Sequence, residues 1–425
     1  MIRATTGGVL KSYRSNLMNS FIAQNKAMTT MLTQRTFNSY AENPASAAMA
    51  FKLRKSRMNT ESQYNICDDT YRKHQTAFTS LDTISKLIDT KNGTDMSTLK
   101  GTTLEMLNDP KGDARTQLSK VLDQLSETIV QTMNNKYGDN FIFAGADGKN
   151  VPFEIKDNKL YYRGVPVDAA VPDVVTDSTG AKVTDANGDY ILSSSTTLSQ
   201  DEYDNAIAGG APAADYISYA TTDENGAAVT RYISTSDAKT ITQTDYKTAE
   251  SDAAKLEYLA NEKYFVDIGL GFQENENGQL IESSGFNASL SGLNFLGYGV
   301  DEDGDPKNIY SLVQKMREIT HSVDDSEDWT KTQYDEFFSL VGKLEDASSE
   351  FKTQFTSMSA GTTKLKNNLE ILEDSFYNLQ EQYSALEDAD MVESISSFLW
   401  AQYCYNAALK AGNNVLSESL MDYLQ

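Results

Sequence analysis

Side chains that could do catalytic or metal chemistry are scarce in this chain. Its 425 residues include only two histidines, His74 and His321, and two cysteines, Cys67 and Cys404. Each histidine lies in a polar helical context with no nucleophile or metal-ligand spacing around it, and the cysteines form neither a metal motif nor a disulfide framework. We expect surface or partly packed histidines and buried cysteines, with no catalytic residue, no metal site and no cofactor.

Two acidic loops, Asp301–Asp305 and Asp185–Asp189, have the carboxylate density of calcium-binding loops. An EF-hand loop needs glycine at its sixth position, where these segments have Pro306 and Tyr190, and the first loop has Leu312 where the final glutamate should be. We interpret both loops as acidic turns. The chain also lacks a phosphate-binding loop, a dinucleotide fingerprint and a nucleophile elbow. The sequence therefore indicates a protein that is not an enzyme.

The charge of the chain is strongly negative and unevenly distributed. The net charge is −24, yet residues 1–57 hold nine Lys or Arg and one acid, Glu42. Residues 146–307 hold eleven bases and twenty-eight acids, as a solvated outer surface would. The basic end can pair with the acidic C-terminal region. Nucleic acid is a weak candidate partner, because phosphate would repel the whole chain and no aromatic residues alternate with the Lys and Arg.

The chain begins MIRATTGGVLKSYRSN, which lacks the continuous apolar run of roughly 7–15 residues that a secretory signal needs. No segment approaches the ~18 apolar residues of a membrane span. The sequence therefore predicts no membrane association. It predicts either a cytosolic protein or one that leaves the cell without a cleaved signal.

Apolar residues at helical spacing dominate the first 140 residues. Leu10, Leu17 and Met31 share one heptad position, and Phe21 and Met28 share another, so together they predict one apolar ridge on a helix.

Two further helices are expected in this part of the chain. Asn43 followed by Pro44 is typical of an N-cap with proline at the first helical position, so a second helix should run from Pro44 to about residue 90. A third helix should follow Asp113 and end near Tyr137-Gly138, where glycine suits a C-cap.

The clearest periodicity lies near the C-terminus. Apolar and aromatic residues there alternate spacings of four and three without interruption: Leu365, Leu369, Leu372, Phe376, Leu379, Tyr383 and Leu386. Leu344, Phe351 and Met358 continue this stripe upstream, so residues 344–386 should form one helix of roughly 65 Å, at ~1.5 Å per residue. A shorter helix should start with Asp305 as its cap and Pro306 in its first turn. Heptad positions of the last helix are Met391, Ile395, Phe398, Tyr405, Leu409 and Leu416.

The residue composition changes at Asn140, between the two helical ends of the chain. Phe141–Phe143 is interpreted as a short buried strand, and residues 146–305 combine short β-prone runs with many Gly, Ser, Thr, Asp and Asn. Asn187-Gly188 and Asn277-Gly278 are hairpin turn signals. A helix is expected around residues 245–262. We interpret this region as a β-rich, acidic outer domain.

These patterns predict an α+β fold in three parts, with helical segments at 1–145 and 306–425 and a β-rich insertion at 146–305. A helix with one apolar stripe is marginal by itself, because most helical stability comes from packing on a partner. We expect the terminal helices to pack together as a coiled-coil rod, within one chain or between subunits, and the middle to protrude. The residues expected at this contact are Leu17, Phe21, Met28, Met31, Leu365, Leu369, Leu372, Phe376, Leu379, Ile395, Phe398, Leu409 and Leu416.

Four motifs occur in order at the two ends of the chain. They are ENPA followed by AMAFKLR within 42–54, GDNFIFAG followed by Pro-Phe within 138–153, SALEDAD at 384–390 and SESLMDYL at 417–424. With these motifs the chain resembles the flagellin family, and within it the branch that joins the hook to the filament. The resemblance covers about 145 N-terminal and 120 C-terminal residues. The residues that carry it are Asn43, Pro44, Phe141, Phe143, Gly145, Asp388, Asp390, Leu420 and Leu424. In one departure, the turn before Asn-Pro reads Arg35 to Tyr40 without the family's usual glycine.

The resemblance implies a structural subunit of the bacterial flagellum that polymerises through its terminal helices. It implies export through the flagellar type III apparatus without a cleaved signal, protection by a flagellar export chaperone, and terminal helices that become ordered on assembly. The protein would be extracellular, at the hook–filament junction, with other copies of itself, another hook-associated protein and flagellin as neighbours.

Two other interpretations stay open. Flagellin, the filament subunit, would be present in thousands of copies per filament, whereas a junction protein would form a single ring. A cytosolic coiled-coil adaptor would be found only inside cells that have working flagella.

Overall fold

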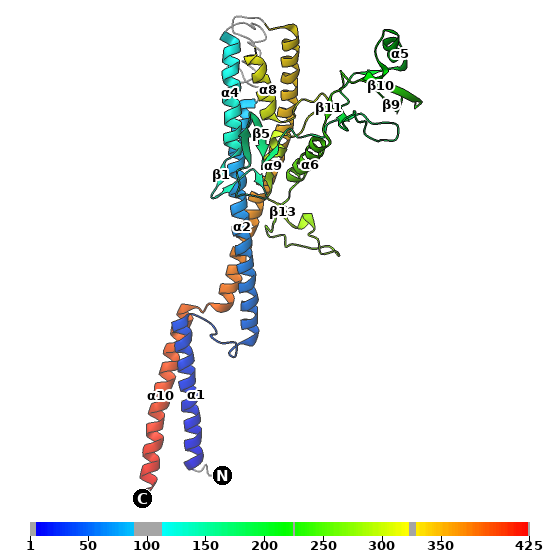
Figure 1. Cartoon of the computed structure of the whole chain (residues 1–425). Helices are drawn as coiled ribbons and strands as arrows, with labels where there is room; N and C mark the ends of the chain where they lie inside the picture. The colour runs from blue at the N-terminus through cyan, green and yellow to red at the C-terminus, as the bar shows by residue number, and fades with distance from the viewer. Residues whose placement is uncertain (1–5, 89–112, 224–225, 323–328, 424–425) are drawn as a thin grey trace. The chain divides into compact units, whose positions relative to one another are not determined.

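The computed structural model describes residues 6–88, 113–223, 226–322 and 329–423. Its internal contacts divide the chain into two compact units. Unit 1 comprises Met1–Asp68, Asp267–Gly271 and Lys366–Gln425, and unit 2 comprises Asp69–Val266 and Phe272–Leu365. Two long helices, α2 and α9, contribute residues to both units (Figure 1).

Unit 1 consists of two pairs of helical segments. Helix α1 lies beside α10, and the first part of α2 lies beside the last part of α9 (Figure 1). Both pairs are antiparallel: the Phe21 ring contacts the Tyr405 ring at a tilt of 48°, with 5.8 Å between centroids, and Arg54 Nη2 donates to Tyr383 Oη at 2.7 Å. The helices are α1 (Thr6–Thr33), α2 (Pro44–Ile88), α9 (Lys331–Glu387) and α10 (Met391–Tyr423).

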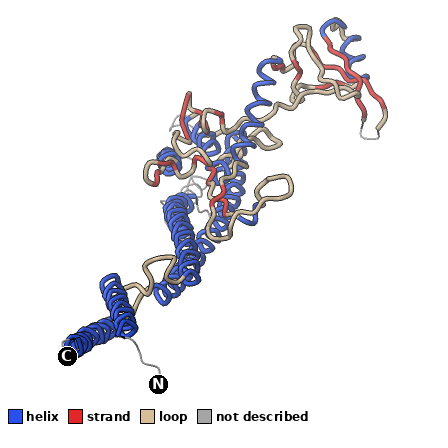
Figure 2. Tube along the Cα trace, turned by 90° about the horizontal axis from the view of Figure 1, so that it is seen from below, coloured by secondary structure: helices blue, strands red, loops and turns tan. Residues whose placement is uncertain are grey.

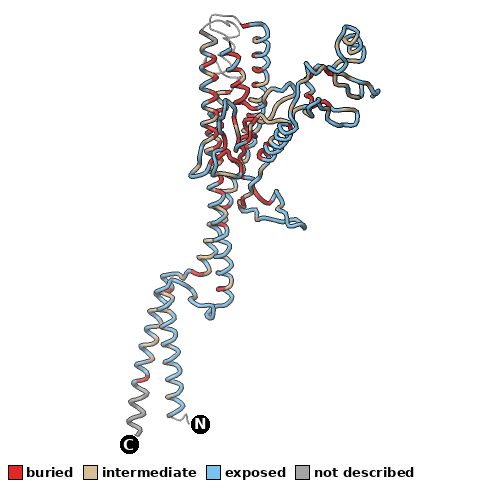
Figure 3. Tube along the Cα trace, in the orientation of Figure 1, coloured by how far each residue is buried: buried red, intermediate tan, exposed pale blue. Residues whose placement is uncertain are grey.

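The main core of the molecule lies in unit 2, where the rest of α2 and α9 pack with α4 (Asp113–Met133) and α8 (Ile309–His321). Phe78 of α2 stacks on Phe355 of α9 with centroids 4.9 Å apart, and Arg317 of α8 pairs with Asp123 of α4 at 2.7 Å. Buried residues concentrate here, whereas α1 and α10 are mostly exposed (Figure 3). Fully buried side chains of this core include Leu81, Ile84, Ile88, Leu118, Leu122, Ile129, Val313, Phe337 and Phe351.

Short strands cover this helical core. They form the antiparallel sheets β1–β2, β3–β14, β4–β5–β6 and β12–β13. Residues 142–143 form a buried turn between β2 and β3, so the single strand expected at Phe141–Phe143 is wrong. The elements are β1 (Lys136–Tyr137), β2 (Asn140–Phe141), β3 (Ala144–Gly145), β4 (Phe153–Lys156), β5 (Lys159–Tyr162), β6 (Val165–Pro166), β12 (Phe265–Val266), η2 (Glu282–Ser284), β13 (Phe286–Asn287), β14 (Leu290–Ser291) and α7 (Gly292–Leu296).

The remaining strands have a small core of their own, formed by Val175, Ile191 and Ile233. They pair in the sheets β8–β10–β9 and β7–β11, and most are short segments separated by loops (Figure 2). Helix α6 confirms the helix expected at 245–262. The elements are β7 (Tyr190–Ile191), β8 (Thr197–Leu198), α5 (Gln200–Ala208), η1 (Ala213–Asp215), β9 (Tyr216–Thr222), β10 (Ala228–Ser234), β11 (Thr240–Ile241) and α6 (Gln243–Ala260).

One hairpin turn recurs five times among the described residues, beginning at Asp177, Asp185, Asp223, Asn275 and Asp301. In each copy the first side chain accepts the N–H of the fifth residue, and the first and fifth residues are also joined through their backbones. The fourth residue is always a glycine with φ between +74° and +86°. Glycine adopts this left-handed conformation without the steric cost that other residues meet. The turns expected at Asn187-Gly188 and Asn277-Gly278 are confirmed, and the two acidic loops use their carboxylates to close such turns.

The long helices confirm the fold class, with terminal helices packed together and a β-rich middle. Helix α9 includes all of residues 344–386, and α2 begins at Pro44. The start expected for the short C-terminal helix is wrong. Asn308, not Asp305, caps α8 by accepting the N–H of Tyr310 at 3.0 Å, because the Asp305 carboxylate is held by Lys315 and Lys343.

His74 is buried, contrary to the expected surface or partly packed position. It shares the three-and-four spacing of Thr70, Ala77 and Leu81, which places it on the buried face of α2. Its ring meets Phe286 of β13 edge-on, with centroids 5.4 Å apart. Neither ring nitrogen has a hydrogen-bond partner among the residues that the structure describes. Burial, helped by the charge of Lys73, lowers the pKa of His74 to about 4.

Acid should destabilise the protein through His74. An unfolded histidine titrates near 6.5, so between about pH 6.5 and 4 the unfolded chain binds more protons than the folded one. The His74 contribution to stability should be complete above pH 6.5 and fall by up to about 3 kcal/mol as the pH drops through 4. Urea unfolding of the native chain and of His74→Leu, compared between pH 7 and 5, measures it. Equal pH dependence in the two proteins would contradict this assignment.

Candidate assembly surface

The contact between α1 and α10 is a regular but narrow seam. The least exposed positions on both helices alternate spacings of four and three, as in a coiled coil. On α1 they are Leu10, Tyr13, Leu17, Ser20, Gln24, Ala27 and Met31, and on α10 they are Ser394, Phe398, Ala401, Tyr405, Ala408 and Gly412. Thr30 and Cys404, each next to one of these positions, are also partly buried. More than half of these side chains are small or polar. The seam therefore buries little apolar surface for its length.

Tyr13 and Gly412 form the tightest contact of this seam. Gly412 is buried, and a Cβ atom added to it would overlap the Tyr13 ring and hydroxyl group. The glycine thus lets a bulky ring lie directly against the backbone of α10.

Large apolar side chains lie outside the seam on both helices. On α1, Met18 and Ile22 are 56% and 53% exposed, and on α10 Trp400 and Tyr403 are 69% and 67% exposed. Single exposed apolar residues are ordinary, but a row of them along a helix marks a contact surface. The other members of this set are Leu32, Val392 and Leu399.

The residues expected at the terminal contact divide into three groups on these two helices. Leu17, Met31 and Phe398 lie in the seam. Leu416 lies within α10, as does Leu420. The rest flank the seam and keep about two-fifths of their surface exposed: Phe21, Met28, Ile395 and Leu409.

The second helix pair of unit 1, between α2 and α9, is better filled. Leu372 is buried, whereas Leu369, Phe376 and Leu379 are partly exposed. Leu365 is also buried, on the part of α9 that belongs to unit 2. Two guanidinium groups lie near the Tyr383 ring, since the Cζ atoms of Arg54 and Arg57 are both 5.4 Å from its centroid. Such cation–π contacts stabilise the pair without apolar side chains at every position.

Segment 267–271, from the insertion, also packs on this pair. Ile268 is buried, and its carbonyl oxygen accepts a hydrogen bond from Asn368 Nδ2. Gln63 Nε2 donates to Asp267 Oδ2 at 3.0 Å, and Gly269 lies against Leu372. Part of the burial of Leu372 therefore comes from a loop about 100 residues away in sequence, which helical periodicity cannot reveal.

The connections between the helices of unit 1 are joined to each other. Thr36 N donates to Glu387 O at 2.8 Å, and Ala389 N donates to Gln34 O at 2.9 Å, around a β-bridge between Arg35 and Asp388. These bonds link the α1–α2 connection to the α9–α10 connection. We call residues 34–36 and 387–389 the joint.

Glu387 is the charged centre of the joint. Its side chain is only 4% exposed and contacts two arginines, Arg35 Nη1 at 3.1 Å and Arg54 Nη2 at 3.2 Å. The hydrogen bond that Arg54 donates to Tyr383, together with the hydrogen bond and charge of Glu387, raises the pKa of Arg54. A buried carboxylate is costly unless it is paired, so Glu387 requires both connections to stay in place.

Caps and a left-handed residue complete the joint. Asn43 Oδ1 accepts from Ser46 N at 3.1 Å ahead of Pro44, and Asp390 Oδ1 accepts from Val392 N at 2.7 Å, so both residues cap helices. Gln34 ends α1 with a φ of 56°, and its N–H bonds to Thr30 O. This is the conformation that glycine usually supplies after a helix. The departure from the family's glycine turn therefore leaves a non-glycine residue in a left-handed position.

Most of the remaining motif residues lie in unit 2. Phe141 and Phe143 are buried, and the Phe143 carbonyl oxygen accepts the Tyr162 hydroxyl at 3.0 Å. Gly145 has a φ of +70°, and a side chain there would meet Glu262. Asp388 lies in the joint, and Leu424 lies outside the described residues.

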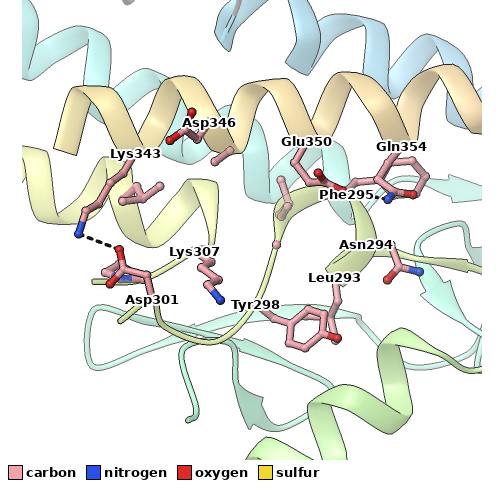
Figure 4. A pocket seen from close by; sticks show the side chains of 15 residues that line it. Leu293, Asn294, Phe295, Tyr298, Asp301, Lys307, Lys343, Asp346, Glu350 and Gln354 are labelled. Atoms are coloured by element: carbon pink, nitrogen blue, oxygen red, sulfur yellow. Dashed lines mark hydrogen bonds and ion pairs between the residues drawn. The ribbon is translucent and has the colours of Figure 1, made fainter. Parts of the chain in front are cut away.

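A groove of about 680 Å³ opens beside α9, α7 and the turn at 301–305 (Figure 4). Lys343 reaches Asp301 at 2.7 Å and Asp303 at 2.9 Å. Desolvation opposes the charge of Lys343, but hydrogen bonds to the three aspartates of this turn raise its pKa. Asp346 and Glu350 on the rim are exposed. The lysine is neutralised within the chain, so the groove presents no activated nucleophile or base.

The few histidines and cysteines, which are the side chains most suited to catalytic or metal chemistry, serve packing in this structure. Cys67 is fully buried, and burial raises the pKa of its thiol. His321 Nε2 lies 2.8 Å from Ser119 Oγ, which links α8 to α4. The described residues contain no group of three His, Cys, Asp or Glu side chains placed to hold a metal ion. Among the same residues, no helix combines the length and apolarity that a bilayer crossing needs.

Comparison with solved structures gives matches over most of the chain. A flagellar hook-associated protein from Vibrio parahaemolyticus is 9% identical, with 82% of this chain and 100% of that chain covered and a TM-score of 0.43. The flagellar junction protein FlgL from Legionella pneumophila is 14% identical, with 81% and 100% covered and a TM-score of 0.35. FlgL from Xanthomonas campestris is 13% identical, with 80% and 99% covered and a TM-score of 0.29. The chain is thus similar, at low identity, to solved proteins of the branch that its motifs indicated. Family models and curated protein sequences give no match.

Replacing Gly412 should separate α1 from α10 locally. In Gly412→Leu the new side chain occupies the space of the Tyr13 ring, and overpacking of this kind costs roughly 1–3 kcal/mol. Hydrogen exchange in residues 6–33 should accelerate. Gly7→Leu is the matched control, because a side chain there meets nothing within 4 Å. Unchanged exchange in Gly412→Leu would show that the seam does not depend on this contact.

Removing the Glu387 carboxylate should open the joint. In Glu387→Ala the two arginines lose their shared partner, and trypsin cleavage after Arg35 should become faster by roughly tenfold, which corresponds to a loss of about 1.4 kcal/mol. Glu381→Ala on the same helix removes an exposed carboxylate and should leave the rate unchanged. If both variants were cleaved as slowly as the native chain, Glu387 would not hold the joint.

Proposed function

We propose that this chain is a structural subunit of the bacterial flagellum, similar to hook-associated protein 3, that joins hook to filament by polymerising through its terminal helices. One observation carries the proposal. Several large apolar side chains of α1 and α10, Trp400 and Tyr403 among them, lie exposed outside the mutual seam of these helices, while small residues such as Ala401 and Ala408 occupy part of that seam. The order of the four sequence motifs at the two chain ends supports the same role.

The energetics favour neighbouring subunits as the partners of these faces. Full burial of a large apolar side chain contributes about 1.5–3 kcal/mol, so covering even three of Met18, Ile22, Leu399 and Trp400 would outweigh a single weak seam. A narrow two-helix pair has little stability of its own. Polymerisation would therefore be driven by apolar burial and would order the helices that it covers.

The proposal assigns a role to each part of the chain. Residues 1–145 and 306–425 would form the helical wall, and the acidic insertion at 146–305 would face outward. Other copies of the chain, another hook-associated protein and flagellin would be its neighbours. A flagellar export chaperone would protect the chain before export. Export without a cleaved signal would then bring the chain to the extracellular hook–filament junction. The role that we propose is structural.

Outward-facing residues of α10 should matter for assembly and not for folding. Tyr403→Ser combined with Trp400→Ser should abolish incorporation into flagella, because it removes two apolar side chains that a neighbour would bury. Monomer stability should change by less than about 0.5 kcal/mol, as for other exposed sites. Immunogold labelling of flagella and urea unfolding of the monomer measure the two effects.

A matched control is available on α6. Tyr258 is 69% exposed, against 67% for Tyr403, so Tyr258→Ser removes the same side chain at the same exposure outside the terminal helices. It should incorporate normally, in a single ring at the filament base. Normal incorporation of the α10 variant would refute the proposal, label along the whole filament would indicate flagellin, and label only inside flagellated cells would indicate an adaptor.

A further inference from the structure

Unit 1 has an acidic stripe on α9. Glu370, Asp374, Tyr377 and Glu381 follow one another at spacings of four, three and four, so they share one face of the helix, and all four are exposed. Leu372 lies on the opposite face, turned toward α2. The stripe is therefore the outer side of the α2–α9 pair.

The same pair has a basic stripe on α2. Phe51, Lys55 and Met58 follow at spacings of four and three, with Lys52 beside them, and all are exposed. The face of α2 that meets α9 contains Ala50 instead, which is buried. This second stripe is the outer side of the pair on its other flank.

Among the residues that the structure describes, no ion pair neutralises the charges of these stripes. Residues 1–68 hold nine bases and three acids, and residues 366–425 hold two bases and ten acids. Arg35 and Arg54 of unit 1 both pair with Glu387. Lys52, Lys55 and the three acids of the α9 stripe face solvent without such a partner in that part of the chain.

We infer that the α2 stripe of one copy docks on the α9 stripe of the next copy. This rests on the proposed function and names the faces through which the copies meet. The two stripes have opposite charge and a similar design, with apolar Phe51 and Met58 on one and Tyr377 on the other. Lysines placed over the Tyr377 ring would add a cation–π contact to the ion pairs.

The position of the stripes determines the kind of assembly. They lie on opposite sides of one helix pair, so no single patch contains both charges. A two-fold symmetric contact would place like charges against each other, which costs several kcal/mol. The complementary contact is head-to-tail, so it repeats in one direction and produces a closed ring or a helical row.

Charge reversal tests this contact in assembled flagella. Lys52→Glu with Lys55→Glu makes both stripes acidic, and Glu370→Lys with Asp374→Lys and Glu381→Lys makes both basic. Each variant should lower incorporation by at least about tenfold, through like-charge repulsion. The chain that carries all five substitutions has exchanged its charges and should recover incorporation to within about twofold of the native chain, since the attraction is restored. Urea unfolding confirms that each monomer is folded.

The outcomes separate the two proposals. A native chain absent from flagella would refute the proposed function itself. Suppose that the native chain is present in flagella. Normal incorporation of either the two-site lysine variant or the three-site acidic variant would then overturn only the docking of these stripes. Loss in both variants without recovery in the five-site chain would also overturn it, because it would show that each stripe meets a different protein. Recovery in the five-site chain alone supports docking between copies.

A cross-linking experiment provides an independent test. In a Cys404→Ser background, Lys55→Cys combined with Asp374→Cys should give a ladder of multimers with a short bis-maleimide in isolated flagella. Each single cysteine variant should stay monomeric, because a head-to-tail contact never brings two copies of one stripe together. Cross-linking of Lys55→Cys alone would demonstrate a two-fold contact and overturn the inference.

Discussion

The structure depends on how little apolar surface α1 and α10 bury against each other. Their seam has regular coiled-coil spacing, but Ser20, Ala27, Ala401 and Ala408 occupy many of its positions. A seam of small side chains brings two helices close together and leaves their large side chains for other contacts. The α1–α10 pair therefore has a defined arrangement, but most of the stabilisation that burial of its exposed apolar side chains could provide is not realised within one chain. Under the proposed function, neighbouring subunits would cover the outward faces and supply that stabilisation, so the same helices would be weak in one chain and strong in an assembly.

The joint explains how such weak helices are held in register with the rest of unit 1. Glu387 is buried between Arg35 and Arg54, and backbone hydrogen bonds link the two connections on either side of it. Buried ion pairs add little net stability but strongly disfavour alternative arrangements, since each leaves a charge unpaired. The joint thus determines where α1 ends and where α10 begins, and the seam needs only to keep the two helices together. Segment 267–271 has a comparable role further along, where it covers Leu372.

Part of this arrangement follows from local sequence. The Leu and Phe stripe of α9 predicts its buried face, and Asn43-Pro44 predicts the start of α2, because both signals come from residues close together in the chain. The α1 ridge was predicted less well. Phe21 and Met28 suggested the seam because they are large and apolar, whereas Tyr13, Ser20 and Ala27 occupy it. Hydrophobicity identifies residues for which burial is favourable. It does not reveal whether a neighbouring helix or a neighbouring molecule buries them.

Other features depend on contacts between distant residues. Asp305 and Asn308 are both good caps, and the choice between them is made by Lys343 on another helix. His74 is polar with charged neighbours in sequence, yet it lies on the buried face that Ala77 and Leu81 define. The joint unites residues about 350 positions apart, and no periodicity predicts it. The opposed charge stripes also depend on distant residues, because they can be recognised only when α2 and α9 are known to pack as a pair.

Hydrogen exchange of the same chain, as a free monomer and within isolated flagella, tests the central claim most directly. If neighbouring subunits supply the missing burial, amides in residues 6–33 and 391–413 should exchange rapidly in the monomer and become strongly protected in the assembly, while α4 and α8 should be protected in both. Equal and strong protection of the terminal helices in the free monomer would show that their own seam suffices, and would contradict the account.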